Sequence, residues 1–244
     1  MPKVSREKFK VFKNVFDEST LNILFKLGSR GHFEELVSPV LIGKESNVFY
    51  AKNSAGEPII VKIYRVENCN FNKMYDYIRQ DPRFLGLKRQ RRKVIFSWVQ
   101  REYRNIFKAR EAGVNVPKPV AVMDNVLLIE FIGNKKTDPP EVSPQLKDIE
   151  IKNPNAYFKK VINNMKKLHK AGLVHADLSA FNILDKNNVP YFIDFSQATT
   201  NESLDYFPLL ARDVRNICIF FSKKGVSADP GVIFKDITGR NIVL

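Results

Sequence analysis

The residues best suited to chemistry lie close together in the second half of the chain. Residues 175–182 read HADLSAFN, and the apolar run YFI then leads to Asp194. Phosphoryl transfer requires a carboxylate that orients the attacking hydroxyl and accepts its proton, and oxygen ligands that hold magnesium against the phosphates. Asp177 suits the first role, and Asn182 and Asp194 suit the second because both are hard oxygen donors. The sequence therefore predicts a phosphoryl-transfer centre built from these three residues.

The spacing of these residues supports the prediction more strongly than any one of them does. An H-x-D-x-x-x-x-N run, followed by an aspartate at the end of an apolar strand, is typical of a protein kinase catalytic loop and its metal-binding aspartate. The alternative is that Asp177 and Asn182 only make turn hydrogen bonds. Order and strand context favour catalysis, whereas we expect His175 to be a structural residue with no catalytic role.

A lysine and a glutamate further upstream complete a kinase-like set. Lys62 lies within the apolar run VKIY at 61–64, and Glu102 lies in the helical pattern that follows. In kinases such a lysine contacts the α and β phosphates, and the helical glutamate holds its ammonium in place. Taken singly, each could be an ordinary surface residue. The prediction that Lys62 and Glu102 form a pair therefore depends on the downstream motif.

The segment Gly43, Lys44, Glu45 and Ser46 occupies the place of a phosphate-binding loop between the first two strands. Its single glycine matches neither G-x-G-x-x-G nor a Walker A sequence. Gly43 can still permit a tight turn in which backbone amides and the Ser46 hydroxyl face phosphate. Spacing alone indicates only a turn.

Hydrophobic periodicity predicts a strand-rich half followed by a helix-rich half. The expected strands are 48–50, 59–64, 120–122 and 126–131, with shorter ones at 173–174, 183–184 and 191–193. The expected helices lie within 15–36, with Ser19 or Thr20 as N-cap, and over 94–111, 155–170 and 205–225. The polar segments 65–93 and 133–154 are expected to be irregular connections.

The composition is strongly basic, which bears on the choice of partner. The chain has 244 residues, with 40 Lys and Arg against 26 Asp and Glu, for a formal net charge of +14. Such an excess favours nucleic acid, nucleotide phosphates or anionic membrane, although solvated lysines would account for it equally well. The run Lys88–Lys93 is either a solvated loop or an RNA contact.

Two further features of composition predict the compartment. Cys69 and Cys218 belong to no C-x-x-C pair, which argues against zinc and a disulfide framework. No apolar stretch reaches the length of a signal-peptide core or a membrane span. We therefore expect a cytoplasmic protein with no membrane partner.

The chain resembles the RIO family of atypical serine/threonine protein kinases, and within it the first subfamily. The resemblance extends from about Val15 to Phe221 and rests on motifs with family-specific flanks. Among these motifs are DPRF at 81–84, HADLS at 175–179, IDFSQ at 193–197 and RDVRNI at 212–217.

The resemblance implies an α+β, two-lobed protein-kinase-like fold that lacks the usual activation segment and substrate-docking helices. An N-terminal helical extension over 1–36 would precede a strand-rich lobe over 37–132 and a helix-rich lobe over 133–244. It also implies ATP as cofactor with Mg²⁺ or Mn²⁺, and adenine binding through backbone groups of Glu130 and Ile132. Asp194 would in addition accept phosphate as an aspartyl phosphate, which allows an ATPase cycle.

The family's role implies a macromolecular partner as well. RIO proteins act in maturation of the small ribosomal subunit, so the subunit or its precursor rRNA is the expected partner, with the protein substrate left unidentified. Two alternatives stay open. One is a small-molecule phosphotransferase of kinase-like fold, and the other is a nucleotide-gated RNA-binding scaffold.

Overall fold

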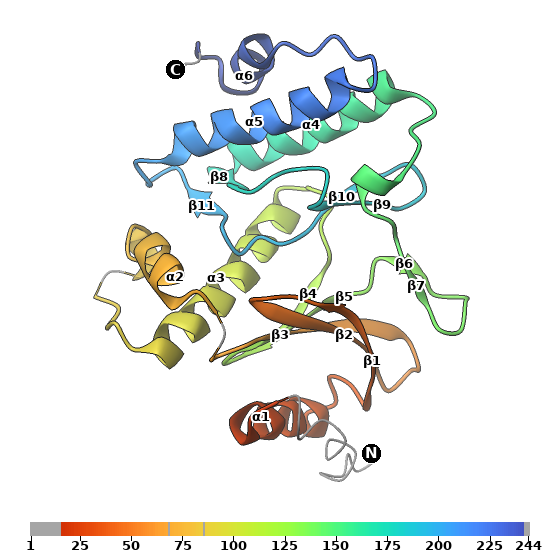
Figure 1. Cartoon of the computed structure of the whole chain (residues 1–244), viewed down its shortest axis with the longest axis vertical. Helices are drawn as coiled ribbons and strands as arrows, with labels where there is room; N and C mark the ends of the chain where they lie inside the picture. The colour runs from red at the N-terminus through yellow and green to blue at the C-terminus, as the bar shows by residue number, and fades with distance from the viewer. Residues whose placement is uncertain (1–15, 68, 85, 242–244) are drawn as a thin grey trace. The chain divides into compact units, whose positions relative to one another are not determined.

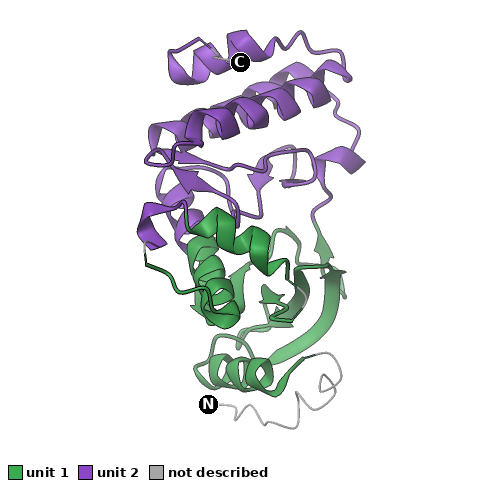
Figure 2. Ribbon diagram, turned by 60° about the vertical axis from the view of Figure 1, so that its left-hand side comes forward, with its two compact units in different colours: residues 1–79, 86–103, 118–142 green, residues 80–85, 104–117, 143–244 purple. Residues whose placement is uncertain are grey.

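The computed structural model describes residues 16–67, 69–84 and 86–241 of the chain. These form two compact units that are not contiguous in sequence (Figure 2). Unit 1 comprises residues 1–79, 86–103 and 118–142, and unit 2 comprises residues 80–85, 104–117 and 143–244. The part of the expected N-terminal extension before Phe16 lies outside the described residues. The long helix α3 (Arg91–Glu111) contributes residues to both units.

The centre of unit 1 is a five-stranded antiparallel sheet in the order β1-β2-β3-β5-β4 (Figure 1). Its strands are β1 (Glu35–Ile42), β2 (Ser46–Lys52), β3 (Pro58–Tyr64), β4 (Pro119–Met123) and β5 (Val126–Glu130). Both hairpins expected from the sequence, β2 with β3 and β4 with β5, are therefore confirmed. The middle strand β3 is buried along its whole length.

Helix α1 (Glu18–Ser29) packs against one face of this sheet. The two elements share one apolar cluster, which includes Ile23, Leu24, Leu27, Ile59, Val61 and Ile63. Because successive side chains of a strand point to opposite faces, Lys62 and Tyr64 lie on the other face of β3. There both of them bond to Glu102 of α3. The period-two alternation of side chains in β3 thus places Lys62 on the face that is turned away from the α1 cluster.

The N-cap of α1 is Asp17, so the expectation of Ser19 or Thr20 was wrong. Asp17 Oδ1 accepts a hydrogen bond from the Thr20 N–H at 2.7 Å. Asp, like Ser and Thr, has a short oxygen-bearing side chain that caps helices, so residue type alone does not decide which of these positions starts the helix. Thr20 is instead buried in the first turn.

The segment 65–93 is more regular than its polar composition indicated. Helix α2 (Phe71–Ile78) and the 3₁₀ helix η2 (Pro82–Phe84) lie within it, and α3 begins at Arg91 rather than at Val94. In α2 only Met74 and Ile78 are buried. Two apolar anchors are too few to produce a clear helical period, which explains why the sequence did not reveal this helix.

Segment 133–154 contains little regular structure, as expected. In unit 1 it includes the short strands β6 (Gly133–Asn134) and β7 (Glu141–Val142), which pair with each other. The 3₁₀ helix η3 (Leu146–Asp148) follows in unit 2.

Unit 2 is built on the helices α4 (Pro154–Lys170), α5 (Tyr206–Ser222) and α6 (Pro230–Thr238). Phe221 of α5 packs on Tyr157 and Phe158 of α4, at ring-centroid distances of 6.3 and 5.1 Å. Two short strand pairs flank the loops 175–182 and 193–198. They are β8 (Leu173–Val174) with β11 (Thr199–Thr200), and β9 (Ile183–Asp185) with β10 (Pro190–Phe192).

Helix α6 is an addition to the predicted outline, in which the helix from Asp205 was the last element. Asp229 caps it by accepting from the Val232 N–H at 2.8 Å, and Gly239 ends it with a φ of 71°. The sequence did carry these signals, an N-cap aspartate before Pro230 and a later glycine. The apolar face is short, because only Phe234 and Ile237 are buried.

Asn125, in the turn between β4 and β5, links three parts of unit 1. Its Nδ2 donates to Thr20 Oγ1 of α1 at 3.0 Å and to the Tyr64 carbonyl of β3 at 2.9 Å. Asn125→Ala removes both bonds from a fully buried site. We expect unfolding free energy to fall by about 2 kcal/mol, because buried polar atoms lose a partner. Chemical denaturation measures this.

Asn163→Ala is the matched control, since Asn163 is exposed on α4. We expect its unfolding free energy to change by no more than about 0.5 kcal/mol. Equal losses in the two variants would show that the Asn125 bonds do not stabilise the sheet.

Candidate functional site

Lys62 and Glu102 form a buried ion pair in unit 1. Lys62 Nζ lies 2.9 Å from Glu102 Oε1, and the two side chains are 10% and 1% exposed. The Tyr64 hydroxyl donates to the other carboxylate oxygen, Oε2, at 2.5 Å. A buried carboxylate is costly unless its oxygens are paired, and here each oxygen has a donor. The structure therefore brings together the two residues that the sequence singled out, and adds Tyr64.

The turn between β1 and β2 is closed by Gly43. Its N–H donates to the Ser46 carbonyl at 3.0 Å, and a Cβ at this position would lie 2.9 Å from the same oxygen. Any larger residue would open the turn. Lys44 is exposed, and the Glu45 carbonyl accepts from the Arg65 N–H at 3.0 Å. The tight turn exists as expected, whereas its phosphate-binding role stays a prediction.

The end of β5 constrains how the predicted adenine contacts could form. The Glu130 N–H donates to the Lys118 carbonyl at 2.8 Å, and Glu130 Oε2 accepts from the Lys118 N–H at 3.0 Å. A nucleotide contact from the backbone of Glu130 would therefore use its carbonyl oxygen. Ile132 follows two residues later and is almost fully buried.

In unit 2, Asp177 is exposed and Asn182 lies against it. Asn182 Nδ2 donates to the Asp177 carbonyl at 2.8 Å and to Asp177 Oδ2 at 3.2 Å. Since the amide nitrogen is used here, the amide oxygen is the atom of Asn182 that suits a metal ion. Mg²⁺ keeps several waters and takes few protein ligands, so one amide oxygen and one carboxylate fit its needs. Within the described residues, no group of three or more His, Cys, Asp or Glu could hold a metal by itself.

Asp194 adopts a backbone conformation that is unfavourable for a residue with a side chain. Its φ is 61°, in the left-handed region. Such a conformation costs of order 1 kcal/mol or more and persists only where the surroundings impose it. The Ile193 N–H donates to the Asn182 carbonyl at 3.0 Å, and the Ile193 carbonyl bonds to His175 Nε2 at 2.9 Å. These bonds join the Asn182 and Asp194 segments, and they make His175 a buried structural residue.

The candidate catalytic loop around Asp177 is held by Asp213 of α5, a residue that the sequence motifs did not single out for a role. Asp213 Oδ2 accepts from the Ala176 N–H at 2.8 Å, and Oδ1 accepts from the Leu178 N–H at 2.9 Å. These residues flank Asp177 on both sides, and Ala176 has a φ of 65°. The carboxylate therefore holds a strained loop in place around an exposed aspartate.

Two neighbours of Asp213 on α5 add to this support. The Arg212 guanidinium donates to the Ala176 carbonyl, and Asn216 Nδ2 donates to the Leu178 carbonyl at 3.2 Å. The backbone N–H and the carbonyl of both residues beside Asp177 thus have hydrogen-bond partners on α5. The signal in the sequence was the run of polar residues RD and RN at 212–213 and 215–216, within a helix that is mostly apolar on either side of it.

Together, a five-stranded sheet with a buried lysine–glutamate pair and a helical unit with an H-x-D loop define a protein-kinase-like fold. Solved structures agree. The Rio2 kinase–ADP/Mg²⁺–phosphoaspartate complex from Chaetomium thermophilum matches with a TM-score of 0.69 at 21% identity, covering 90% of this chain and 65% of that one. The expected α+β fold is confirmed.

The family is shown by sequence comparison. Residues 47–232 match the model of the RIO domain. The RIO-type serine/threonine-protein kinase Rio1 of Methanocaldococcus jannaschii is 41% identical, covering 97% of this chain and 80% of the relative. The protein of the same description from Haloferax volcanii is 36% identical, covering 96% and 79%. The chain belongs to the RIO family.

Across residues 16–67, 69–84 and 86–241, no helix is both long enough and apolar enough to cross a bilayer.

The Asp213 carboxyl has an unusual titration behaviour that can be tested. Burial raises its pKa to about 7, against the opposing effects of the Leu178 and Ala176 N–H donors and Arg212. The folded protein therefore keeps a proton that the unfolded chain releases near pH 4. The bound proton therefore stabilises the folded protein at low pH, and this stabilisation is lost as pH rises through the pKa of the folded state.

We expect the unfolding free energy of the wild type to fall, relative to Asp213→Asn, between about pH 4 and pH 7. The slope is at most about 1.4 kcal/mol per pH unit. Chemical denaturation across this range measures it. Asp236→Asn, which removes an exposed carboxyl of α6, should follow the wild-type curve. If the unfolding free energies of wild type and Asp213→Asn change in parallel with pH, the raised pKa of Asp213 is contradicted.

Proposed function

We propose that this protein is an ATP-dependent serine/threonine protein kinase or ATPase of RIO type, with Asp177 as the proton acceptor. The observation that carries the proposal is the support of the catalytic loop, in which Asp213 bonds the peptide N–H groups on both sides of Asp177. An exposed carboxylate on a rigid loop suits a general base that must meet an incoming hydroxyl.

The remaining residues take the roles that phosphoryl transfer needs. Asn182 and Asp194 would hold Mg²⁺ or Mn²⁺, which when bound neutralises charge on the phosphates. Lys62, oriented by Glu102 at 2.9 Å, would contact the α and β phosphates of ATP. The turn Gly43–Ser46 would face phosphate, and the backbone of Glu130 and Ile132 would bind adenine.

The acceptor is proposed from the relatives. Those at 36–41% identity are described as serine/threonine-protein kinases, which favours a protein hydroxyl over a small alcohol. The Chaetomium Rio2 complex holds a phosphoaspartate, and Asp194 is our candidate for the same chemistry here. In that cycle a carboxylate oxygen would bond to the γ-phosphorus as ADP leaves, and water would then hydrolyse the acyl phosphate.

Loss of either aspartate should abolish turnover without unfolding the protein. We expect Asp177→Ala and Asp194→Ala each to lower Mg²⁺-dependent ATP turnover by about 10³-fold, because the general base or a metal ligand is lost. Thermal midpoints should stay close to that of the wild type, since Asp177 is exposed and Asp194 only partly buried.

Asp205→Ala is the control, because Asp205 precedes α5 and makes no capping hydrogen bond. Its turnover should equal that of the wild type. Substantial turnover in both Asp177→Ala and Asp194→Ala would contradict the proposal.

A second assay identifies the acceptor. Labelled ATP is supplied with purified small subunits, with other proteins or with small alcohols, and the labelled product shows which of the three classes accepts phosphate. Nucleotide binding without phosphoryl transfer would favour the scaffold alternative.

We also propose the small ribosomal subunit or its precursor rRNA as partner, in keeping with the net charge of +14. The basic cluster Lys88, Arg89, Arg91, Arg92 and Lys93 is exposed in unit 1. Within the described residues none of the five pairs with a carboxylate. Arg89 lies over the rings of Phe71 and Tyr75, at 5.9 and 5.5 Å. Arginine planes beside aromatic rings suit unpaired RNA bases, and the lysines suit phosphates.

Charge reversal of this cluster should weaken RNA binding. We expect Lys88→Glu/Arg92→Glu/Lys93→Glu to lower affinity for small-subunit rRNA by at least about 10-fold and to make its salt dependence shallower, because fewer counterions are released. Arg91 is left in place because it donates to the Glu67 carbonyl at 2.9 Å. Filter binding over a salt series measures both quantities.

The triple variant Lys223→Glu/Lys224→Glu/Lys235→Glu matches the change in net charge with exposed lysines of unit 2. It should keep most of the wild-type affinity. Equal losses in the two triple variants would mean that only overall charge matters, and unchanged binding in the first would exclude this cluster as the contact.

A further inference from the structure

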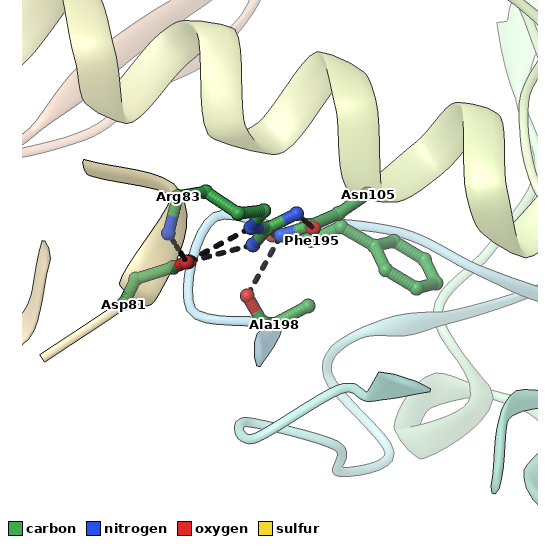
Figure 3. A network of polar contacts seen from close by, with 5 residues as sticks. All are labelled: Asp81, Arg83, Asn105, Phe195 and Ala198. Atoms are coloured by element: carbon green, nitrogen blue, oxygen red, sulfur yellow. Dashed lines mark hydrogen bonds and ion pairs between the residues drawn. The ribbon is translucent and has the colours of Figure 1, made fainter. Parts of the chain in front are cut away.

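A buried polar network in unit 2 holds the segment that follows Asp194 (Figure 3). At its centre is Asn105 of α3, whose side chain has no exposed surface. Asn105 Nδ2 donates to the Ala198 carbonyl at 2.7 Å and to the Phe195 carbonyl at 3.2 Å. Two carbonyls just after Asp194 are therefore held by one amide.

Arg83, at the turn formed by η2, fixes the orientation of that amide. Its Nη1 donates to Asn105 Oδ1 at 2.9 Å. Its Nε and Nη2 donate to the two carboxylate oxygens of Asp81, at 2.9 and 2.6 Å. Asp81 is 1% exposed, and a bidentate pair of this kind is directional as well as strong. With Oδ1 directed at Arg83, Nδ2 of Asn105 must face the carbonyls.

The position of the network relative to Asp194 suggests what it does. Asp194 has a φ of 61°, and such a residue needs support on both sides to keep that conformation. On the N-terminal side, Ile193 is bonded to Asn182 and His175. On the C-terminal side, the Phe195 carbonyl is bonded to Asn105. Removal of the second support would let the Asp194 backbone relax.

We infer that Asn105, oriented by Arg83 and Asp81, is a positioning residue that keeps Asp194 in its metal-binding conformation, an inference that rests on the proposed role of Asp194. Asn105 does not touch the reacting groups. It acts through the backbone, as residues behind a metal ligand do when they fix the ligand's direction. A network that only stabilised the fold would lower the thermal midpoint and leave metal affinity unchanged.

Metal affinity is therefore the decisive measurement. Mn²⁺ binding to the ADP complex is followed by electron paramagnetic resonance of unbound Mn²⁺, and ADP affinity is measured separately in EDTA. We expect Asn105→Ala to weaken Mn²⁺ binding by about 10-fold, with ADP affinity in EDTA unchanged. The Mg²⁺ concentration for half-maximal ATP turnover should rise in parallel.

Arg83→Gln tests the same chain of contacts in a side chain that is only partly buried, 23% exposed. We expect a smaller loss of Mn²⁺ affinity in the same direction. The double variant should be no worse than Asn105→Ala alone, because Arg83 acts through Asn105 and the two effects are not additive. Arg79→Gln, which removes an exposed arginine paired with Asp76, is the control and should behave as wild type.

The outcomes separate this inference from the proposed function. If wild type binds Mn²⁺ with ADP and Asp194→Ala abolishes that binding, but Asn105→Ala and Arg83→Gln leave it unchanged, the inference is overturned and the function stands. If Asp194→Ala has no effect on Mn²⁺ binding, Asp194 is not a metal ligand, and the result contradicts the proposed function itself. Should Asn105→Ala not fold, Arg83→Gln decides alone, and unchanged Mn²⁺ affinity in that variant overturns the inference.

Discussion

In unit 2 the two oxygens of Asp213 each accept one backbone N–H, from Ala176 and from Leu178. The geometry of the candidate catalytic loop depends on this interaction. The loop contains a left-handed Ala176 and carries an exposed Asp177, and neither feature would keep one position without a fixed anchor. Helix α5 supplies the anchor because its apolar face, which includes Phe221, is packed on α4. The exposed Asp177, our candidate general base, is therefore held in place by a buried carboxyl group.

The same principle applies to the other candidate residues. Lys62 is held by Glu102, whose second oxygen takes a hydrogen bond from Tyr64, and the segment after Asp194 is held by Asn105. Each supporting group is buried, and each has its hydrogen bonds supplied, as the cost of an unpaired buried polar atom requires. Glu102 and Asn105 stand one turn apart on α3, so a single helix carries support for Lys62 in unit 1 and for residues 195–198 in unit 2.

Elements with many buried apolar residues could be predicted from the sequence, and elements with few could not. The strands of the two hairpins, α3, α4 and α5 follow strong periods of two or of about 3.6 residues. Helices α2 and α6 each bury only two residues, so their local pattern is weak and tertiary packing decides them. The N-cap of α1 was misassigned for a related reason, since Asp17, Ser19 and Thr20 have similar intrinsic suitability.

For the candidate site, the sequence by itself determined which groups are present and how they are spaced locally. Asp177, Asn182 and Asp194 could be found because phosphoryl transfer needs these functional groups at short, fixed separations within one segment. Only the tertiary structure decided what holds them. Asp213 bonds residues about 35 positions away and Asn105 about 90, and no local pattern encodes a partner at such distances. Hydrogen bonds depend on positions in space, and the packing of α3 and α5 sets those positions.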